Sequence, residues 1–321
     1  MRMGVFKTTV IGVFVMTIIG LLSLSTGCSA SFTQVEDVVS KTFTVGEGGT
    51  LTMNVGLGSI EIITENGNDI NVKIIRKVNT SKHEKARGIF DQYKVDFNQS
   101  GKDLTIKNDY RSERGFFSWL DGKQLNIKYI ITVPKKYNLD LNTKGGSVTI
   151  SEIEGKVLTK TSGGSLKFNY INGSIYGRTS GGSIRVDKCT GNVDVDTSGG
   201  SIRIGRVEGD IKADTSGGSI TIEDASGTVK CDTSGGSINT TLSKQPKSNC
   251  KLTTSGGSIT VFLAPDSKVD VNARTSAGRI STDFTDIQGN IEKSRMNAKI
   301  NGGGPELFLE TSGGSIRIKK I

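Results

Sequence analysis

The sequence is poor in the residues that usually build a thick globular core or a catalytic centre. Aromatic residues make up 6% of the 321 residues, and His83 is the only histidine. A core built on large aromatic side chains is therefore not expected. A Ser/His/Asp triad would have to use His83, which has no cysteine near it and fits a surface position better. Only four prolines accompany 42 glycines, so the glycines indicate turns rather than a disordered linker.

Residues 1–27 have the pattern of an export signal. A basic start is followed by an apolar run over residues 10–24, and small residues lead to Cys28. This order resembles the bacterial lipoprotein signal, in which the cysteine is diacylated and becomes the mature N-terminus. Ser25 stands where that signal usually has an aliphatic residue, so an uncleaved membrane anchor and ordinary cleavage after Ala30 remain alternatives. All three interpretations predict export of the remaining chain.

Loss of the signal would leave a modest positive charge. The whole chain has 41 Lys and Arg against 32 Asp and Glu, and Arg2 and Lys7 are the only charged residues of the signal, so 39 basic and 32 acidic residues remain, a net +7. Outside a cell this charge suits contact with anionic wall polymers or lipid headgroups, and it equally suits ordinary solubility. Nucleic acid is not expected as a partner, because the chain has no basic helix and no interleaving of basic with aromatic residues.

The motif Thr-Ser-Gly-Gly-Ser-Ile recurs along the second half of the chain. Its starts from Thr143 to Thr233 follow an 18-residue period, the next two intervals are three positions longer, and the last equals two periods. Copies and variants begin at Thr143, Thr161, Thr179, Thr197, Thr215, Thr233, Thr254, Thr275 and Thr311. Between them, Ile-x-Ile and Val-x-Val alternate as in short strands with one face turned inward. A strand this short cannot bury its apolar face alone, so each coil is expected to stack on the next.

The sequence therefore predicts an all-β fold, a parallel β-solenoid with 18-residue coils ~4.8 Å apart. Right-handed winding, a β-helix, is expected because parallel crossovers favour that hand. A left-handed helix with three six-residue sides is disfavoured, because apolar residues do not recur every six positions. Gly-Gly marks one corner and the glycine at the thirteenth position of the repeat marks the other, and backbone torsions that a Cβ would oppose are expected at these corners. Stacking should also align the threonines and serines of the motif in hydroxyl ladders.

Three cysteines fall within the repeats. Cys189 lies at an inward position, and Cys231 and Cys250 do so if the three-residue insertion between them lies in the loop around Pro246. They are expected to act as small core residues, with a bridge between Cys231 and Cys250 as the alternative.

The composition divides the chain into four parts. Residues 1–27 are the predicted signal peptide, 28–40 a tether, 41–142 an irregular N-terminal β-region of the solenoid, and 143–321 the regular repeat with a C-terminal cap. Apolar side chains at helical spacing within residues 81–97 predict one short helix. This helix is expected to cap the open first coil, whose unpaired backbone would otherwise invite aggregation.

Three features together resemble a known bacterial family. They are the repeated motif, the segment at residues 129–134 before the repeats, and the Asn-Gly-Gly-Gly at 301–304 before the last motif. The family consists of β-strand-repeat proteins named as candidate adhesins, a domain of unknown function. The resemblance covers nearly all of the mature chain. It implies a β-solenoid on envelope proteins, some linked with envelope-stress operons, and it supplies no catalytic residues.

An enzyme on a β-solenoid is the strongest rival, because polysaccharide lyases and hydrolases place carboxylates on one face of such scaffolds. Four aspartates should point outward, the last three in one column: Asp194, Asp196, Asp214 and Asp232. Paired carboxylates can act as acid and base or hold calcium. However, this column repeats because the motif repeats, whereas enzyme sites usually break a repeat, and Lys212 and Lys230 should partly neutralise it. No catalytic residue, metal site or cofactor is therefore expected.

The opposite outward column should carry three stacked cations, Lys167, Arg185 and Arg203. Like charges one coil apart repel, a cost that is small in water or is offset by a bound anion. These residues are the candidate strip for an anionic glycopolymer or lipid headgroups.

Together these features predict a non-enzymatic cell-surface lipoprotein, an adhesin or a protein of envelope interaction or stress. Its expected partners are the membrane through a lipid anchor, and anionic cell-wall polymers, glycans or another envelope protein. A polysaccharide-active enzyme and a purely structural spacer are the alternatives.

Overall fold

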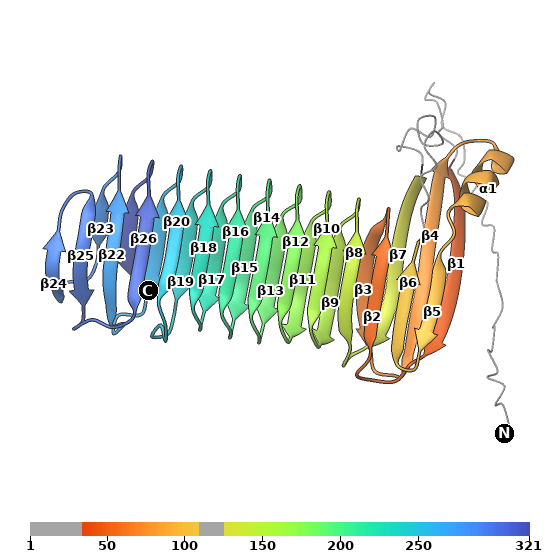
Figure 1. Cartoon of the computed structure of the whole chain (residues 1–321), viewed down its shortest axis with the longest axis horizontal. Coiled ribbons are helices and arrows are strands. Elements are labelled where there is room, and N and C mark those ends of the chain that lie inside the picture. Colours follow the sequence, from red (N-terminus) through yellow and green to blue (C-terminus); the bar gives the residue numbers. More distant parts are fainter. Residues whose placement is uncertain (1–33, 109–124) are drawn as a thin grey trace, which may run out of the picture.

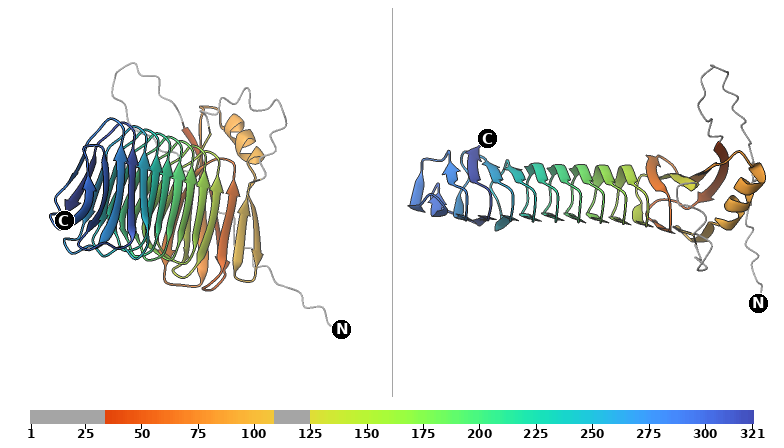
Figure 2. Two further views of the ribbon diagram at one scale, coloured as in Figure 1. Left: turned by 60° about the vertical axis from the view of Figure 1, so that its left-hand side comes forward. Right: turned by 90° about the horizontal axis from the view of Figure 1, so that it is seen from above.

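In the computed structural model, which describes residues 34–108 and 125–321, the chain forms a long flattened rod of two facing β-sheets (Figure 1). Sheet A has 13 strands and sheet B has 14. Seen from above, the two sheets lie face to face along the regular part of the rod (Figure 2). Within the described residues, most neighbouring strands pair in parallel, and antiparallel strands occur only at the two ends of the rod. The predicted parallel β-solenoid is confirmed.

Each regular coil contains two strands and two turns. From β14 (Val193–Thr197) in sheet B, the motif turns the chain into β15 (Ile202–Val207) in sheet A. A second turn at residues 208–210 returns it to sheet B as β16 (Ile211–Thr215), which pairs in parallel with β14 at a shift of one 18-residue period. The predicted two short strands per coil are thus present.

The other regular coils repeat this path. In sheet B they contribute β8 (Asn138–Thr143), β10 (Val157–Thr161), β12 (Ile175–Thr179), β18 (Val229–Thr233) and β20 (Cys250–Thr254). In sheet A they contribute β9 (Val148–Glu154), β11 (Leu166–Asn172), β13 (Ile184–Cys189), β17 (Ile220–Ala225), β19 (Ile238–Leu242) and β21 (Ile259–Leu263).

The core is a thin layer of Ile, Val and Leu between the two sheets. In β15, Ile202 and Ile204 are buried on alternate positions, and Val207 is buried three positions further on. The spacing changes because one residue of the strand, Gly205 in β15, is left out of the pairing with β13. After this residue the alternation of inward and outward side chains is shifted by one position. Stacking these apolar positions removes them from water, which is the main stabilising contribution available to such short strands.

The second glycine of each motif is required by space. A Cβ at Gly200 would collide with the backbone of Gly182 in the preceding coil, whereas a Cβ at Gly199 would make ordinary contacts. Neither Gly199 nor Gly200 has a positive φ. The expectation that this corner needs unusual backbone torsions is therefore wrong, because close approach of neighbouring coils is what excludes a side chain.

The motif threonines and serines bond along the stack, as predicted. Thr215 Oγ1 donates to the carbonyl of Gly200 at 2.8 Å and accepts from the N–H of Gly218 at 3.4 Å. The N–H of Ser219 donates to Ser201 Oγ at 3.3 Å. Each hydroxyl therefore bonds the backbone of a neighbouring coil or turn, rather than the next hydroxyl of its column. The same threonine bond recurs in eight other coils.

At the N-terminal end, the coils do not follow the order of the chain. The coil of β2 (Thr50–Val55) and β3 (Ser59–Glu65) lies directly on the coil of β8 and β9. The next part of the chain, β6 (Asp103–Lys107) and β7 (Leu125–Pro134), forms an outer coil on the far side of β2 and β3. Residues 59–62, which look like a worn copy of the motif, thus occupy a true coil position.

Antiparallel strands close this end of the rod. In sheet A, β4 (Asp69–Asn79) covers β7, and β1 (Gln34–Thr44) covers β4; in sheet B, β5 (Asp96–Ser100) covers β6. The predicted short helix is present as α1 (His83–Gln92). It packs through Ala86, Ile89 and Phe90 against Val78 of β4. The helix lies at this end of the rod, as expected, but β4, β1 and β5 rather than α1 cover the strand edges there (Figure 1).

The coils at the C-terminal end also depart from chain order. The last strands, β26 (Glu306–Thr311) and β27 (Ile316–Lys320), lie inside the rod, while β22 (Val269–Thr275) and β23 (Ile280–Thr282) lie outside them. The hairpin of β24 (Ile287–Ile291) and β25 (Arg295–Ile300) extends sheet B beyond β22. Figure 1 shows β26 between β20 and β22. The expectation that each coil stacks on the next is therefore wrong at this end.

Candidate binding surfaces

Cys28, the predicted lipidation site, and the predicted signal peptide lie outside the described residues. Across residues 34–108 and 125–321, no helix is both long and apolar enough to cross a membrane. In the same ranges, no group of three or more His, Cys, Asp or Glu side chains is placed to hold a metal ion. The candidate residues that the sequence analysis named lie on the outer faces of the two sheets.

The predicted strip lies on the outer face of sheet A. Lys167, Arg185 and Arg203 are in register on β11, β13 and β15. Arg185 Nε donates to Asp187 Oδ1 at 2.6 Å, and Arg203 Nη1 lies 3.4 Å from Glu223 Oε1. Both arginine side chains are 56% exposed. Each arginine thus has a carboxylate partner on the surface and still faces water.

A second column of cations, which the sequence analysis did not identify, runs beside the strip. Lys188 and Arg206 are in register on β13 and β15, and Arg206 Nε lies 3.3 Å from Asp224 Oδ2. The two columns and their partners form the basic patch of sheet A: Lys167, Arg185, Lys188, Arg203 and Arg206 with Asp187, Glu223 and Asp224. Five cations against three carboxylates leave a charge of +2 on this patch.

On the outer face of sheet B, Asp196, Asp214 and Asp232 form the predicted acidic column. Burial raises the pKa of Asp214, and the carboxylates of Asp196 and Asp232 add a smaller effect in the same direction. Lys212, whose Nζ lies 3.4 Å from Asp214 Oδ2, opposes this shift without cancelling it. Burial of the Asp214 carboxylate is thus the main electrostatic cost in the column, and repulsion by its neighbours adds to it.

These carboxylates do not converge as an acid and base would. Asp194 lies in the neighbouring column and pairs with Arg178 at 2.6 Å, and Asp232 accepts a hydrogen bond from Thr253. The aspartates stand one per coil at the positions that the repeat gives them. The arrangement therefore lacks a carboxylate pair facing each other across a substrate.

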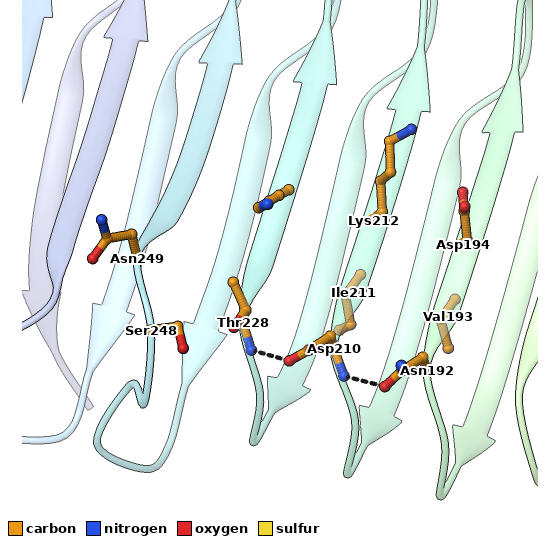
Figure 3. Close-up of a pocket in the computed structure, with 10 residues that line it drawn as sticks. Asn192, Val193, Asp194, Asp210, Ile211, Lys212, Thr228, Ser248 and Asn249 are labelled. Atoms are coloured by element: carbon orange, nitrogen blue, oxygen red, sulfur yellow. Dashed lines mark hydrogen bonds between the residues drawn. The ribbon is translucent and has the colours of Figure 1, made fainter.

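A groove of about 690 Å³ lies on this face, where the repeat is interrupted. It is bounded by the loop 243–249 between β19 and β20, which replaces the three-residue turns 190–192, 208–210 and 226–228 of the preceding coils. Its lining consists of Asn192, Val193, Asp194, Asp210, Ile211, Lys212, Thr228, Lys230, Ser248 and Asn249. Figure 3 shows the loop residues Ser248 and Asn249 on one side and a row of turn residues along the lower edge.

The row of turn residues is held by a ladder of side chain to backbone bonds. Asn192 Oδ1 accepts from the N–H of Asp210 at 3.0 Å, and Asp210 Oδ1 accepts from the N–H of Thr228 at 2.8 Å (Figure 3). The ladder uses only one polar atom of each side chain. The amide nitrogen of Asn192 and the second carboxylate oxygen of Asp210 remain open to the groove.

The three cysteines of the repeats are buried and free, which confirms them as core residues and excludes a bridge between Cys231 and Cys250. Their register explains this, since Cys231 lies opposite Leu252 on β20. Burial raises the pKa of the Cys189 thiol to about 11, against a weaker effect of a hydrogen bond to Gly191. A thiol with such a pKa is protonated at neutral pH and is a poor nucleophile.

The comparison with known families decides where this solenoid belongs. The model of the Toastrack family, DUF4097, matches residues 50–319. The chain belongs to the Toastrack family. The match spans the irregular N-terminal coils as well as the regular repeat, so it confirms the resemblance to a β-strand-repeat family of unknown function.

Several solved structures are similar to this Toastrack chain, each over 88% of its length. One is described as a candidate cell adhesion protein from Clostridium sporogenes (13% identity, 100% of that chain, TM-score 0.23). Another is a candidate adhesin from Bacteroides fragilis (13%, 97%, TM-score 0.37), and a third is a candidate lipid-binding protein from Parabacteroides distasonis (14%, 96%, TM-score 0.38). Because all three TM-scores lie below 0.5, nothing about function follows from them. No curated protein matches the chain.

Proposed function

We propose that this Toastrack protein is a non-enzymatic binding scaffold of the cell envelope. In this proposal the basic patch of sheet A holds an anionic envelope polymer along the axis of the rod. The observation that carries the proposal is the stacking of five cations in two columns on one flat, exposed face. A rigid row of charges spaced by ~4.8 Å can contact an extended polyanion at many points, and such contacts add up because the later ones are effectively intramolecular.

The carboxylates on the patch do not prevent such binding. Exposed ion pairs such as Arg203–Glu223 contribute only about 0–1 kcal/mol, so an incoming phosphate or carboxylate displaces them at little cost. Arg185 uses Nε for Asp187, which leaves its two Nη groups for a ligand. A guanidinium presents its remaining N–H groups in a planar fork that matches phosphate and carboxylate oxygens.

Export and lipid anchoring at Cys28 are part of the proposal. They are supported by the signal-like pattern of residues 1–28 and by the position of β1, which begins at Gln34. Six residues span at most about 20 Å, so an acylated Cys28 would hold the N-terminal end of the rod close to the membrane. The regular coils would then extend away from the membrane and present both faces to the envelope.

The experiment compares retention on purified cell walls and on vesicles containing anionic lipid. The probe protein is the mature chain, residues 28–321, with Cys28→Ser to prevent acylation. The variant Lys167→Ala, Arg185→Ala, Arg203→Ala should lose most of the retention on walls. A matched variant with Lys268, Lys293 and Lys299 changed to Ala loses the same charge elsewhere and should be retained like the wild type.

Equal retention of the patch variant and the wild type would reject the patch as the binding surface. Retention on vesicles but not on walls would identify lipid headgroups as the source of the anionic groups. A protein that is retained on neither surface would favour the structural spacer, and release of sugar from walls would favour the enzyme.

A further inference from the structure

The groove on sheet B lies on the opposite face of the rod from the basic patch. It forms between Thr233 and Thr254, where the interval between motif starts is three positions longer than the period. A groove made by an exception to the repeat is not a by-product of stacking, because the preceding coils have a tight turn at the same position. The groove volume of about 690 Å³ lies within the range of small-molecule sites.

The loop that forms one wall of the groove is fixed at several points. The side-chain amide of Gln245 donates to the carbonyl of Lys268 and accepts from its N–H, both at 2.8 Å. Ser243 Oγ donates to Asp224 Oδ1 at 2.5 Å. Asn249 Oδ1 accepts from the N–H of Glu306 at 3.0 Å. A wall held in this way is preorganised, so a ligand does not have to order it.

The polar atoms that remain free in the groove suit sugar hydroxyls. The ladder leaves the Asn192 amide nitrogen as a donor and one Asp210 oxygen as an acceptor, one coil apart. Thr228 and Ser248 add hydroxyl groups to the lining of the groove, whereas the side chain of Asn249 turns toward Glu306 (Figure 3). A sugar hydroxyl both donates and accepts a hydrogen bond, so neighbouring hydroxyls match alternating donors and acceptors better than a purely anionic ligand would.

The charged lining residues, Asp194, Asp210, Lys212 and Lys230, balance to zero, and the lysine without an ion pair favours an acidic group in the ligand. Lys212, Lys230 and Lys251 are in register in one column. Lys212 pairs with Asp214, whereas Lys230 forms no ion pair within the described residues. An ammonium group without a carboxylate at the edge of a polar groove attracts a carboxylate or phosphate of the ligand.

We propose that this groove binds a short oligosaccharide that carries an acidic group, with its hydroxyls on the Asn192–Asp210 ladder and its acidic group at Lys230. The groove binds without cleaving. Asp194 is tied to Arg178, and Asp210 accepts a backbone N–H, so neither is placed as a general acid opposite a base. The site is independent of the basic patch, because the two surfaces are on opposite sheets.

The test is calorimetric titration of residues 28–321, with Cys28→Ser, against three probes. An oligogalacturonate supplies sugar hydroxyls and carboxylates, a neutral galacto-oligosaccharide supplies hydroxyls alone, and a glycerol phosphate oligomer supplies phosphates without a sugar ring. The oligogalacturonate should bind, and the neutral sugar should bind at least tenfold more weakly. Lys230→Ala should weaken the binding of the oligogalacturonate by about tenfold, which is the effect of losing one charge-assisted hydrogen bond.

Lys293→Ala removes an exposed lysine between β24 and β25, outside both the groove and the basic patch, and should leave oligogalacturonate binding unchanged. Deletion of residues 244–246 restores the 18-residue spacing and should abolish binding, and Lys230→Ala keeps the test valid if this deletion does not fold. The proposal is overturned if no sugar binds, if the glycerol phosphate oligomer binds more tightly than the oligogalacturonate, or if Lys293→Ala weakens binding as much as Lys230→Ala. If no sugar binds in the groove but the patch variant still loses its retention on cell walls, the groove proposal fails and the proposed function of the basic patch stands.

Discussion

Thr311 lies directly beside Thr254 on neighbouring parallel strands, although another copy of the motif comes between them in the sequence. Thr311 Oγ1 donates to the carbonyl of Gly257 at 2.7 Å, the bond that every regular coil makes to its neighbour. On the other side, Thr275 Oγ1 donates to the carbonyl of Gly314, also at 2.7 Å. The last coil is therefore bonded on both sides like any other, and only its place in the chain is unusual.

This arrangement predicts that removal of residues 306–321 disrupts the end of the rod and spares its middle. Without β26 and β27, the outer coil loses its parallel partner and faces a gap of one layer. Because each coil of a solenoid contacts only its neighbours, the effect should not spread far. Hydrogen exchange should show loss of protection over residues 264–305 and retained protection over residues 143–242. Full protection of β22 in the shortened chain would contradict the prediction.

The two glycines of one motif should respond differently to alanine. Gly200→Ala places a Cβ against the backbone of Gly182 and should lower the free energy of unfolding by about 1–3 kcal/mol. Gly199→Ala meets no close atom and should change it by less than about 0.5 kcal/mol. Urea unfolding of the two variants measures the difference. Equal effects would show that backbone torsion, not space, selects glycine at this corner.

Two threonine-to-valine substitutions should have opposite effects on the stability of the protein. Thr215→Val removes a buried hydroxyl that bonds Gly200 and Gly218, and it should destabilise the protein by about 1–3 kcal/mol. Thr240 is also buried, but its Oγ1 has no hydrogen-bond partner within the described residues. Thr240→Val should therefore stabilise the protein by roughly 1 kcal/mol. Thermal unfolding of both variants provides the measurement, and a destabilised Thr240→Val would point to an unseen partner for that hydroxyl.

The acidic column predicts a stability difference that depends on pH. The pKa of Asp214 is raised in the folded protein, so its negative charge disfavours folding at neutral pH and ceases to do so once the group is protonated. Asp214→Asn should thus stabilise the protein at pH 7 by roughly 0.2–1 kcal/mol. The gain should disappear as the pH falls through the range in which carboxyl groups titrate. Asp266→Asn, at an exposed aspartate outside the column, is the control and should show no gain at either pH.

The buried thiols should be unreactive in the folded state. With the Cys189 pKa near 11 and Cys231 fully buried with its pKa raised further by burial, little thiolate is present at pH 8. A thiol reagent added to residues 28–321 with Cys28→Ser should label no cysteine until denaturant is added, and then three. Rapid labelling of any one of them in the native protein would show that its coil opens.

The columns of side chains along the rod could be predicted, because an 18-residue repeat allows only one register between the strands of neighbouring coils. Once Thr197 is placed on Thr215, the positions of Arg185 and Arg203 on one face follow. The order of the end coils could not be predicted in this way, because the coil of Thr254 presents the same strand edges to the coil of Thr275 and to that of Thr311. Local sequence does not distinguish these two partners.

The candidate surfaces were predictable to a similar extent. Lys188 and Arg206 were missed because they follow the residue that sheet A leaves out of its pairing, although their 18-residue spacing was a usable signal. The longer gap after Thr233 marked an insertion. That its loop would form one wall of the groove beside the ladder of Asn192 and Asp210 depends on how the loop is anchored to Lys268, a contact between distant residues.

The insertion of the last coil also decides what stands at the tip of the molecule. The tip is built by β22 to β25, which precede the last two strands in the chain, whereas Ile321 lies beside Leu263 on the flank, where its N–H donates to the Leu263 carbonyl (Figure 1). A domain fused after Ile321 would therefore project sideways and would not lengthen the rod. An antibody against the hairpin of β24 and β25 would instead reach the end of the rod opposite β1.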